Sequence, residues 1–410
     1  MNMPVRERIW KGEGTHRVPY WVYTDDGIYQ RELQRIFGGP AWSYVGLEAE
    51  IPHEGDFKRT KIGETSVIVV RGKDQEIHVL KNQCAHRGLE VCKQDYGSNR
   101  TFQCPYHQWT YRLNGDLSGV PFIRGVGGLG GMPEDFDRAD HGLTKLKVAT
   151  RNGVIFATFS PDVEPLEQFL GEKMLKLFDR VFTGRPLRIL GVSRQRIPGN
   201  WKLMFENIKD PYHASLLHVF LVTFSLFRAD NPSRTEMDST GRHSALISRR
   251  GERNANTATQ EMASFQEKLE LHDPKLLDIV KEFPDTATVV MQTIWPNLIV
   301  QQQANTLATR QIVPVGPEAF DLNWTFFGYE DDDDAMRARR LRHANLMGPA
   351  GFVSLDDSEV MELAQRGIHC DEDAAAVVEM GGRDRADHNH IVTETAIRAF
   401  YGYYREVMGL

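Results

Sequence analysis

Hydrophobic and polar residues alternate in short runs between about residues 40 and 160. Ser66–Arg71 and Glu76–Leu80 flank a polar turn, which predicts a β-hairpin. Asn114-Gly115 separates two further short runs, and this dipeptide is the strongest short-range hairpin signal. Thr144–Ser160 has the pattern of another hairpin. The pattern therefore predicts a small all-β domain over 40–160.

After Pro161 the pattern becomes a mixture of helical and strand periods. The acidic run Asp331–Asp334 precedes a basic helical stretch, and we interpret it as a solvated helix N-terminus with favourable dipole charges. The expected helices are 28–37, 200–220, 336–347, 355–365 and 392–408, and the expected strands lie in 286–303, 307–315 and 321–329.

The overall composition is that of an ordinary globular protein. A chain of 410 residues is long enough for two or three domains, and 41% hydrophobic with 26% charged residues excludes a disordered chain or a fibre. The formal net charge of −7 argues against nucleic acid or an anionic membrane as the main partner. No apolar run predicts a transmembrane helix or a signal peptide, so we expect a cytoplasmic enzyme or binding protein.

Two short segments combine cysteine and histidine. Cys84-x-His86 is followed, after seventeen residues, by Cys104-x-x-His107, which favours a metal site over disulfides. Two thiolates and two imidazoles can hold zinc, or a two-iron cluster with the cysteines on one iron and the histidines on the other. The spacing alone leaves both open, although a zinc finger would more often group its cysteines together. Cys92 fits no ligand position and is interpreted as a packed thiol.

A second candidate site lies in the predicted helix 200–220. His213 and His218 are five residues apart, about 140° on an ideal helix, so they would not face one point. We therefore predict a π-bulge or break between Ala214 and Leu217, a frequent feature of functional sites. This pair alone is equally compatible with two structural histidines.

A carboxylate would complete such a site. Iron centres that activate O₂ commonly use two histidines and one carboxylate, with other positions open. Asp210 lies three residues before His213, and the distant segment 347–359 offers Asp356 and Asp357. The residues themselves do not decide between the two neighbouring aspartates.

In this order the two motifs resemble those of the Rieske non-haem iron aromatic-ring-hydroxylating oxygenases, and the resemblance to their large (α) subunit covers essentially the whole chain. It implies an α+β fold in which an all-β Rieske [2Fe-2S] domain (40–160) is inserted into a helix-grip-like catalytic domain with a central antiparallel sheet (1–39 and 161–410). The implied ligands are Cys84, His86, Cys104 and His107 for the cluster, and His213, His218 and Asp357 for mononuclear Fe(II).

The family resemblance also implies partners and a catalytic carboxylate. It implies electrons from a ferredoxin and/or an NAD(P)H-dependent reductase, and an α₃ or α₃β₃ assembly with a small β subunit. In the family, the aspartate matching Asp210 bridges the iron ligand matching His213 and the cluster ligand matching His107 of a neighbouring subunit. A shared carboxylate would orient both imidazoles.

The substrate implied is a small aromatic carboxylate. Residues 17–25, 201–218 and 348–357 resemble the branch of salicylate, anthranilate and terephthalate oxygenases, and Arg310 matches an arginine that contacts the substrate carboxylate there. Ile391 stands where terephthalate-type enzymes have a second arginine. We therefore expect a monocarboxylate: first salicylate 5-hydroxylation to gentisate, then anthranilate 1,2-dioxygenation to catechol, and then a terephthalate-type reaction. Further pocket candidates are Asn207, Gln292, Gln303, Val353 and His390.

The sequence also allows three other interpretations. Gly125–Gly130 fits the G-x-G-x-x-G pattern but lacks a preceding buried strand and a following helix, so we expect a flexible loop and no bound nucleotide. A zinc-stabilised, non-catalytic helix-grip binding module would use the first site only. A demethylase-type Rieske monooxygenase, usually an α-only trimer, is the rival within the enzymes.

Overall fold

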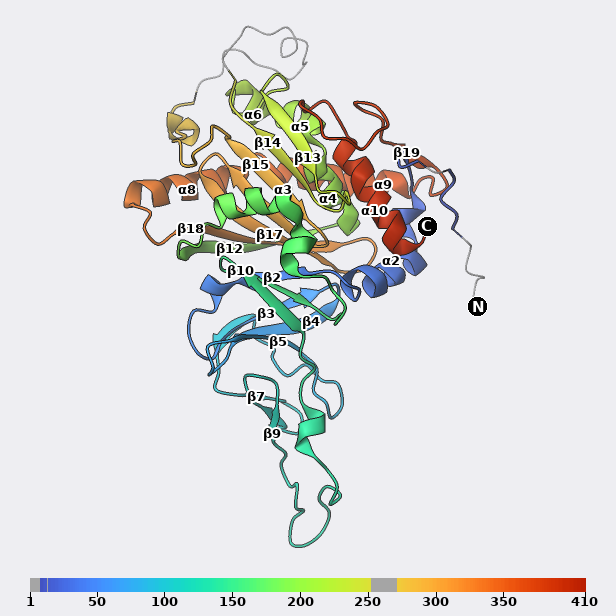
Figure 1. The fold of residues 1–410 in the computed structure, drawn as a ribbon, viewed down its shortest axis with the longest axis vertical. Helices are drawn as coiled ribbons and strands as arrows, with labels where there is room; N and C mark the ends of the chain where they lie inside the picture. Colours follow the sequence, from blue (N-terminus) through green and yellow to red (C-terminus); the bar gives the residue numbers. More distant parts are fainter. Residues whose placement is uncertain (1–7, 13, 252–270) are drawn as a thin grey trace. The chain divides into compact units, whose positions relative to one another are not determined.

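The computed structural model describes residues 8–12, 14–251 and 271–410. The chain divides into two compact units, one of residues 37–163 and the other of residues 1–36 and 164–410 (Figure 1). The smaller unit is thus an insertion between two parts of the larger one. Its bounds differ by three residues at each end from the expected domain 40–160.

The smaller unit is built from short antiparallel strands in three sheets. The predicted hairpins are confirmed: β4 pairs with β5, β8 with β9, and β10 with β11. Gly115, in the Asn-Gly turn, has a φ of 88°, which a residue with a Cβ rarely adopts. The strands are β2 (Ser43–Leu47), β3 (Asp56–Ile62), β4 (Thr65–Arg71), β5 (Ile77–Lys81), β6 (Tyr96–Ser98), β7 (Phe102–Gln103), β8 (Thr110–Tyr111), β9 (Leu117–Gly119), β10 (Lys147–Arg151) and β11 (Val154–Thr158).

The core of this unit lies directly beneath the two cysteine loops. Phe57, Phe102 and Tyr111 are buried in one cluster that also includes Cys84 and Cys104. Burial of these aromatic rings is the main force that holds such short strands together. The two cysteine loops therefore rest on the aromatic core of this unit.

The larger unit contains a seven-stranded antiparallel sheet in the order β12-β18-β17-β16-β15-β14-β13. The central antiparallel sheet expected for the catalytic domain is confirmed. The expected strand region 286–303 forms two strands, because the chain turns at Trp295–Asn297. The strands are β12 (Leu187–Ile197), β13 (Ser233–Met237), β14 (Ser244–Ser248), β15 (Val289–Ile294), β16 (Leu298–Gln303), β17 (Thr306–Pro314) and β18 (Phe320–Tyr329), with a separate pair of β1 (Arg17–Pro19) and β19 (Ala375–Val377).

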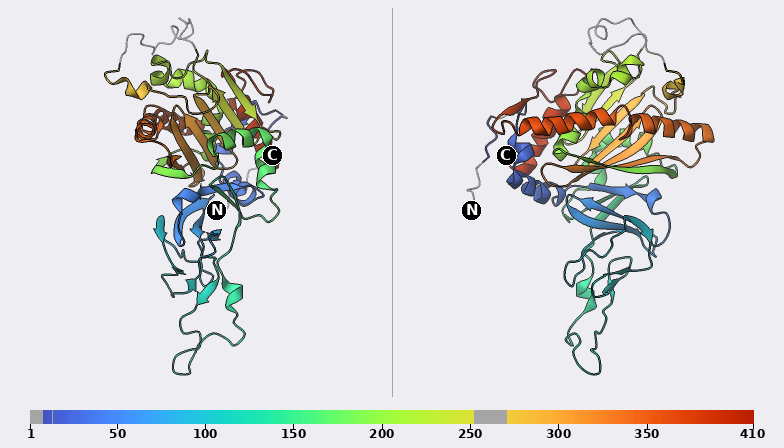
Figure 2. Two further views of the ribbon diagram at one scale, coloured as in Figure 1. Left: turned by 60° about the vertical axis from the view of Figure 1, so that its left-hand side comes forward. Right: turned by 180° about the vertical axis from the view of Figure 1, so that it is seen from behind.

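Helices pack around this sheet, and α8 and α9 follow one another across it (Figure 2). Most of the expected helices are confirmed, with ends that differ by at most three residues. The expected helix 28–37 is confirmed as α2 continued by a π-helical turn over Leu33–Phe37. The helices are α1 (Trp21–Thr24), α2 (Asp26–Glu32), α3 (Leu166–Val181), α4 (Trp201–Lys209), α5 (Pro211–Leu217), α6 (Val219–Thr223), α8 (Asp334–Met347), α9 (Ser354–Ile368) and α10 (Thr395–Met408).

The expected helix over 200–220 forms three short helices, because the chain breaks at Asp210 and at His218. Asp210 ends α4 and begins α5, where its side chain accepts hydrogen bonds from the backbone N–H groups of Tyr212 and His213. His218 has φ −84° and ψ 75°, which is outside the helical region and separates α5 from α6. A break between the two histidines was predicted in 214–217, and it lies one residue later, at His218 itself.

The acidic run before α8 is only partly the solvated helix start that we expected. Asp333 caps the helix by accepting from the N–H of Met336 at 2.7 Å. Asp332, in contrast, is buried and pairs with the buried guanidinium of Arg340 at 2.7 Å. The interpretation of a solvated run is therefore wrong for Asp332.

Candidate metal centres and substrate cavity

The two Cys/His loops of the smaller unit have nearly the same backbone geometry. In each loop the cysteine N–H donates to the carbonyl five residues later, at 2.8 Å, which is Leu89 O for Cys84 and Trp109 O for Cys104. The residue four positions after each cysteine, Gly88 or Gln108, has a positive φ and donates back to the cysteine carbonyl. Two similar tight turns therefore present one cysteine and one histidine each.

The side chains of these loops are arranged with thiols inside and imidazoles outside. Cys84 and Cys104 are 3% and 2% exposed, whereas His86 and His107 are half-buried with ring centroids 4.6 Å apart. The ring of His86 stacks on Trp109 at 4.8 Å. Among the described residues the buried Nδ1 of His86 has no hydrogen-bond partner.

This arrangement fits a two-iron cluster. Burial raises the pKa of the Cys104 thiol, so a thiolate there needs a metal cation to compensate its charge. Burial lowers the pKa of His86, helped by the charges of His107 and Arg87, which favours the neutral imidazole that binds metal. The unpaired Nδ1 of His86 leaves a lone pair available for that bond.

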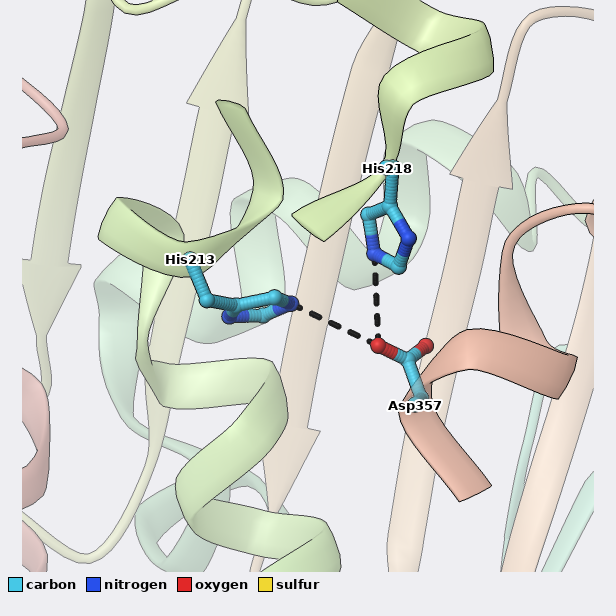
Figure 3. Close-up of side chains that lie close together, drawn as sticks. All are labelled: His213, His218 and Asp357. Carbon is cyan, nitrogen blue, oxygen red and sulfur yellow. Dashed lines mark ion pairs between the residues drawn. The ribbon is translucent and has the colours of Figure 1, made fainter. Parts of the chain in front are cut away.

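In the larger unit, His213, His218 and Asp357 converge from three elements (Figure 3). The Nε2 atoms of His213 and His218 lie 3.5 Å and 3.2 Å from Asp357 Oδ1. One donor atom from each residue lies within 4.8 Å of the others, so the three could hold one metal ion. The break at His218 turns its ring toward that of His213, and Asp357 reaches them from the first turn of α9.

Each imidazole has a second carboxylate behind it. His213 Nδ1 lies 3.5 Å from Asp210 Oδ2, and His218 Nδ1 lies 3.4 Å from Asp356 Oδ2. Carboxylates in this position fix the tautomer and orientation of a metal-binding histidine. The sequence suggested Asp356 only as an alternative metal ligand, and its contact with His218 is a position that sequence reasoning missed.

The charges at this site favour a bound cation. Burial opposes protonation of His213, but the carboxylates of Asp210 and Asp357 raise its pKa to about 10. Burial also opposes ionisation of Asp357, yet the two histidines hold its pKa well below the usual range. The carboxylates of Asp210 and Asp357 therefore stabilise a positive charge at the histidines. A metal ion would compete with a proton for the same nitrogen atoms.

A cavity opens beside these three residues. It holds about 470 Å³ of space, including the solvent at its mouth, and its lining includes His213, His218 and Asp357. Four of the expected pocket residues line it: Asn207, Gln303, Arg310 and Val353. The walls are largely apolar and include Leu221, Phe227, Leu246, Val289 and Met291. Apolar walls with few polar groups are typical of small-molecule sites.

Two expected pocket residues lie elsewhere. Gln292 is on the opposite face of β15 from Met291, and its Nε2 donates to Met174 O of α3 at 3.0 Å. His390 is exposed and stacks on His388 at 5.1 Å. The expectation that Gln292 and His390 line the cavity is therefore wrong. Ile391 is fully buried and is also absent from the lining.

Arg310 is the one lysine or arginine among the described residues of the lining. It is 3% exposed, its Nε donates to Gln301 Oε1 at 2.7 Å, and its guanidinium lies over the Trp324 ring at 4.2 Å. Its buried Nη1 has no partner among the described residues. Burial lowers the pKa of Arg310 to about 9, while the charge of Asp357 opposes this shift. An anionic ligand group would compensate this buried cation.

Family models match both units. Residues 41–129 match the Rieske [2Fe-2S] domain, and residues 185–410 match the ring hydroxylating alpha subunit (catalytic domain). The chain belongs to the ring-hydroxylating oxygenase α subunits. Members of this family carry a Rieske cluster and mononuclear iron, work with ferredoxin or reductase partners, and form oligomers.

Relatives in the ring-hydroxylating family align with almost the whole of this chain. The large oxygenase component of salicylate 5-hydroxylase from Ralstonia sp is 56% identical over 98% of this chain and 96% of its own length. The large subunit of anthranilate 1,2-dioxygenase from Burkholderia cepacia is 46% identical, over 96% and 93%. An α subunit of terephthalate 1,2-dioxygenase from Comamonas sp is 42% identical, over 98% and 97%.

Solved structures agree in fold. Naphthalene 1,2-dioxygenase from Rhodococcus sp. aligns with a TM-score of 0.79 at 25% identity, over 96% of this chain and 94% of that chain. Membership of the ring-hydroxylating family excludes a zinc-stabilised, non-catalytic module. The glycine-rich stretch 125–130 forms a loop in the smaller unit, as expected. Among the described residues, no helix is long and apolar enough to cross a membrane.

Proposed function

We propose that this α subunit hydroxylates an aromatic monocarboxylate, and that salicylate, converted to gentisate, is its substrate. The observation that carries the proposal is Arg310, a buried cation with no carboxylate partner among the described residues, in the wall of the cavity that His213, His218 and Asp357 also line. A single guanidinium matches one carboxylate. The 56% identity to a salicylate 5-hydroxylase supports the same choice.

The metal-binding residues belong to the proposal as well. We assign the [2Fe-2S] cluster to Cys84, His86, Cys104 and His107, and the mononuclear Fe(II) to His213, His218 and Asp357. The thiols inside, the imidazoles outside and the unpaired Nδ1 of His86 support the first set. The convergence of two imidazoles and one carboxylate supports the second set, because this combination leaves coordination positions open. Bound iron supplies the O₂ chemistry.

The side chains of the chain itself perform three tasks in this proposal. Arg310 binds the substrate carboxylate, and the apolar walls hold the ring and exclude water. Asn207 donates from Nδ2 to Asp357 Oδ1 at 3.0 Å, which holds that carboxylate in place. Asp210 holds His213 through Nδ1 and, following the family, also accepts from His107 of a neighbouring subunit, which gives electrons a short connected route.

Anthranilate, with catechol as product, is the second candidate. It is also a monocarboxylate with an ortho substituent, and the 46% identity to an anthranilate 1,2-dioxygenase supports it. Terephthalate is disfavoured, because the described lining offers one guanidinium for its two carboxylates.

The electron donor and the assembly complete the proposal. We assign a ferredoxin and/or an NAD(P)H-dependent reductase as the electron source, and an α₃ or α₃β₃ assembly with a small β subunit. Copurification with a small subunit would separate these assemblies and would count against a demethylase-type α-only trimer.

A single-turnover experiment tests the proposed reaction without the native reductase. The purified protein, shown to contain iron at both sites, is reduced chemically and exposed to O₂ with salicylate or anthranilate in separate vessels. We expect gentisate from salicylate. Catechol from anthranilate, with no product from salicylate, would make anthranilate the substrate. No product from either compound would refute both proposed substrates.

A further inference from the structure

Gln301 on β16 connects two residues of the cavity wall without lining the cavity itself. Arg310 Nε donates to Gln301 Oε1 at 2.7 Å, and Gln301 Nε2 donates to Gln303 Oε1 at 3.0 Å. Gln301 is fully buried, whereas Arg310 and Gln303 both belong to the lining. Gln301 and Gln303 are two residues apart on one strand, so they share one face of the sheet.

The guanidinium determines the orientation of both amides. A guanidinium can donate hydrogen bonds but cannot accept them, so Gln301 must turn its oxygen toward Arg310. The NH₂ group of Gln301 then faces Gln303 and requires the oxygen of that amide as acceptor. The NH₂ group of Gln303 is consequently the end that remains for a ligand in the cavity.

Arg310 and Gln303 therefore present two hydrogen-bond donors to the cavity. Arg310 Nη1 is buried without a partner among the described residues. Gln303 uses its oxygen to accept from Gln301, so its Nε2 takes no part in that hydrogen bond. Trp324 lies under the guanidinium at 4.2 Å and restricts its tilt. A carboxylate has two acceptor oxygens and can accept from both donors. A carboxamide has only one acceptor oxygen, so its NH₂ group would face one of the two donors.

We propose that Gln301 is a positioning residue that makes the cavity selective for an ionised carboxylate, by fixing the guanidinium of Arg310 and the amide of Gln303 as donors. The inference rests on the proposed aromatic monocarboxylate substrate and deepens it. Gln301 acts through its two neighbours and does not touch the substrate.

The test compares salicylate with its neutral analogue salicylamide. Binding to iron-loaded, anaerobic protein is measured by calorimetry, and steady-state KM and kcat are measured with an added reductant. In Gln301→Glu, the new carboxylate forms an ion pair with Arg310 and neutralises its charge. The NH₂ group of Gln303 can then turn away from the cavity and donate to the same carboxylate. We expect Kd and KM for salicylate to rise about tenfold or more, with kcat at saturation and Kd for salicylamide within about threefold of wild type.

A second variant and a control separate positioning from stability. Gln301→Met removes both hydrogen bonds without adding charge, and it should also weaken salicylate more than salicylamide. Gln302→Glu makes the same change on the opposite face of β16, where Gln302 Nε2 donates to Thr288 O and Ala304 O. This control should leave the preference for salicylate unchanged. In an Arg310→Gln background, Gln301→Glu should have no further effect on salicylate.

The outcomes are distinct. Unchanged salicylate affinity in both Gln301 variants overturns the positioning role while leaving the proposed substrate intact. Equal loss of salicylate and salicylamide also overturns it, because that result indicates general damage to the cavity. If the wild-type protein does not prefer salicylate over salicylamide, the proposed substrate class is refuted. The positioning role of Gln301 is then refuted as well, without a measurement on any variant.

Discussion

Asp356 Oδ2 lies 3.4 Å from Nδ1 of His218, on the side of the imidazole that faces away from Asp357. The adjacent aspartates of α9 therefore contact the two nitrogen atoms of one histidine ring. The same relation holds at the other histidine, where Asp210 and Asp357 lie on opposite sides of the His213 ring. Each proposed iron-binding imidazole is thus held from behind by its own carboxylate.

Replacing Asp356 should weaken iron retention at the mononuclear site. In Asp356→Ala the Nδ1 of His218 loses its carboxylate, and iron affinity should fall roughly 10- to 100-fold. The measurement is iron content after dialysis against a graded chelator, with the Rieske absorbance as an internal reference. Glu359→Gln, which removes a charge from the same helix, is the control. Equal iron retention in Asp356→Ala and wild type would contradict the role.

Replacing Asp210 should uncouple reduction of the cluster from product formation. Asp210→Asn can still cap α5, since asparagine is also a good N-cap residue, so folding should be preserved. Cluster content and its reduction should be normal, whereas product formed per electron should fall roughly 100-fold. Normal product yield from this variant, with reductant supplied, would refute the bridging role of Asp210.

Removing the cation of the cavity should affect carboxylate binding. In Arg310→Met the substrate carboxylate would be buried without a partner, and Kd for salicylate should rise about 100-fold. Arg188→Met changes an exposed arginine on the edge strand β12 and serves as the matched control. Calorimetric titration of iron-loaded protein measures the difference. A rise in Kd no larger than that of Arg188→Met would remove Arg310 from the substrate site.

Glu206 should make the stability of the protein depend on pH. Burial raises its pKa to about 7, although hydrogen bonds from Tyr401 and Tyr23 oppose the shift. Between pH 4.5, its ordinary pKa, and about 7, the unfolded chain loses this proton while the native state keeps it. Wild-type stability should therefore fall as pH rises through this window, by roughly 3 kcal/mol from this group.

Glu206→Gln tests this pH dependence, because the amide imitates the protonated acid. The difference in free energy of unfolding between Glu206→Gln and wild type should grow in favour of the variant from pH 4.5 to 7 and then level off. Glu330→Gln, at an exposed glutamate, is the matched control for the loss of one carboxyl group. A constant difference for Glu206→Gln would contradict the raised pKa.

The sequence by itself determined most of the local elements and the candidate metal-binding residues of both sites. Asn114-Gly115 fixed a hairpin because few residues accept the backbone conformation of that turn. The pairing of cysteine with histidine in each loop, and of His213 with His218, named the candidate ligands because few side chains bind iron. Arg310 is a candidate substrate-binding residue through its resemblance to an arginine of the family.

Only the tertiary structure decided which way side chains face and where the helix breaks. Gln292 and Gln303 look alike in the sequence, but Gln292 faces α3 and Gln303 faces the cavity, since alternation along a strand does not say which face is the pocket. The break fell at His218 because the ring must turn toward Asp357, which is 139 residues away in the chain. Such contacts depend on packing between distant segments, and a local pattern of residues carries no information about them.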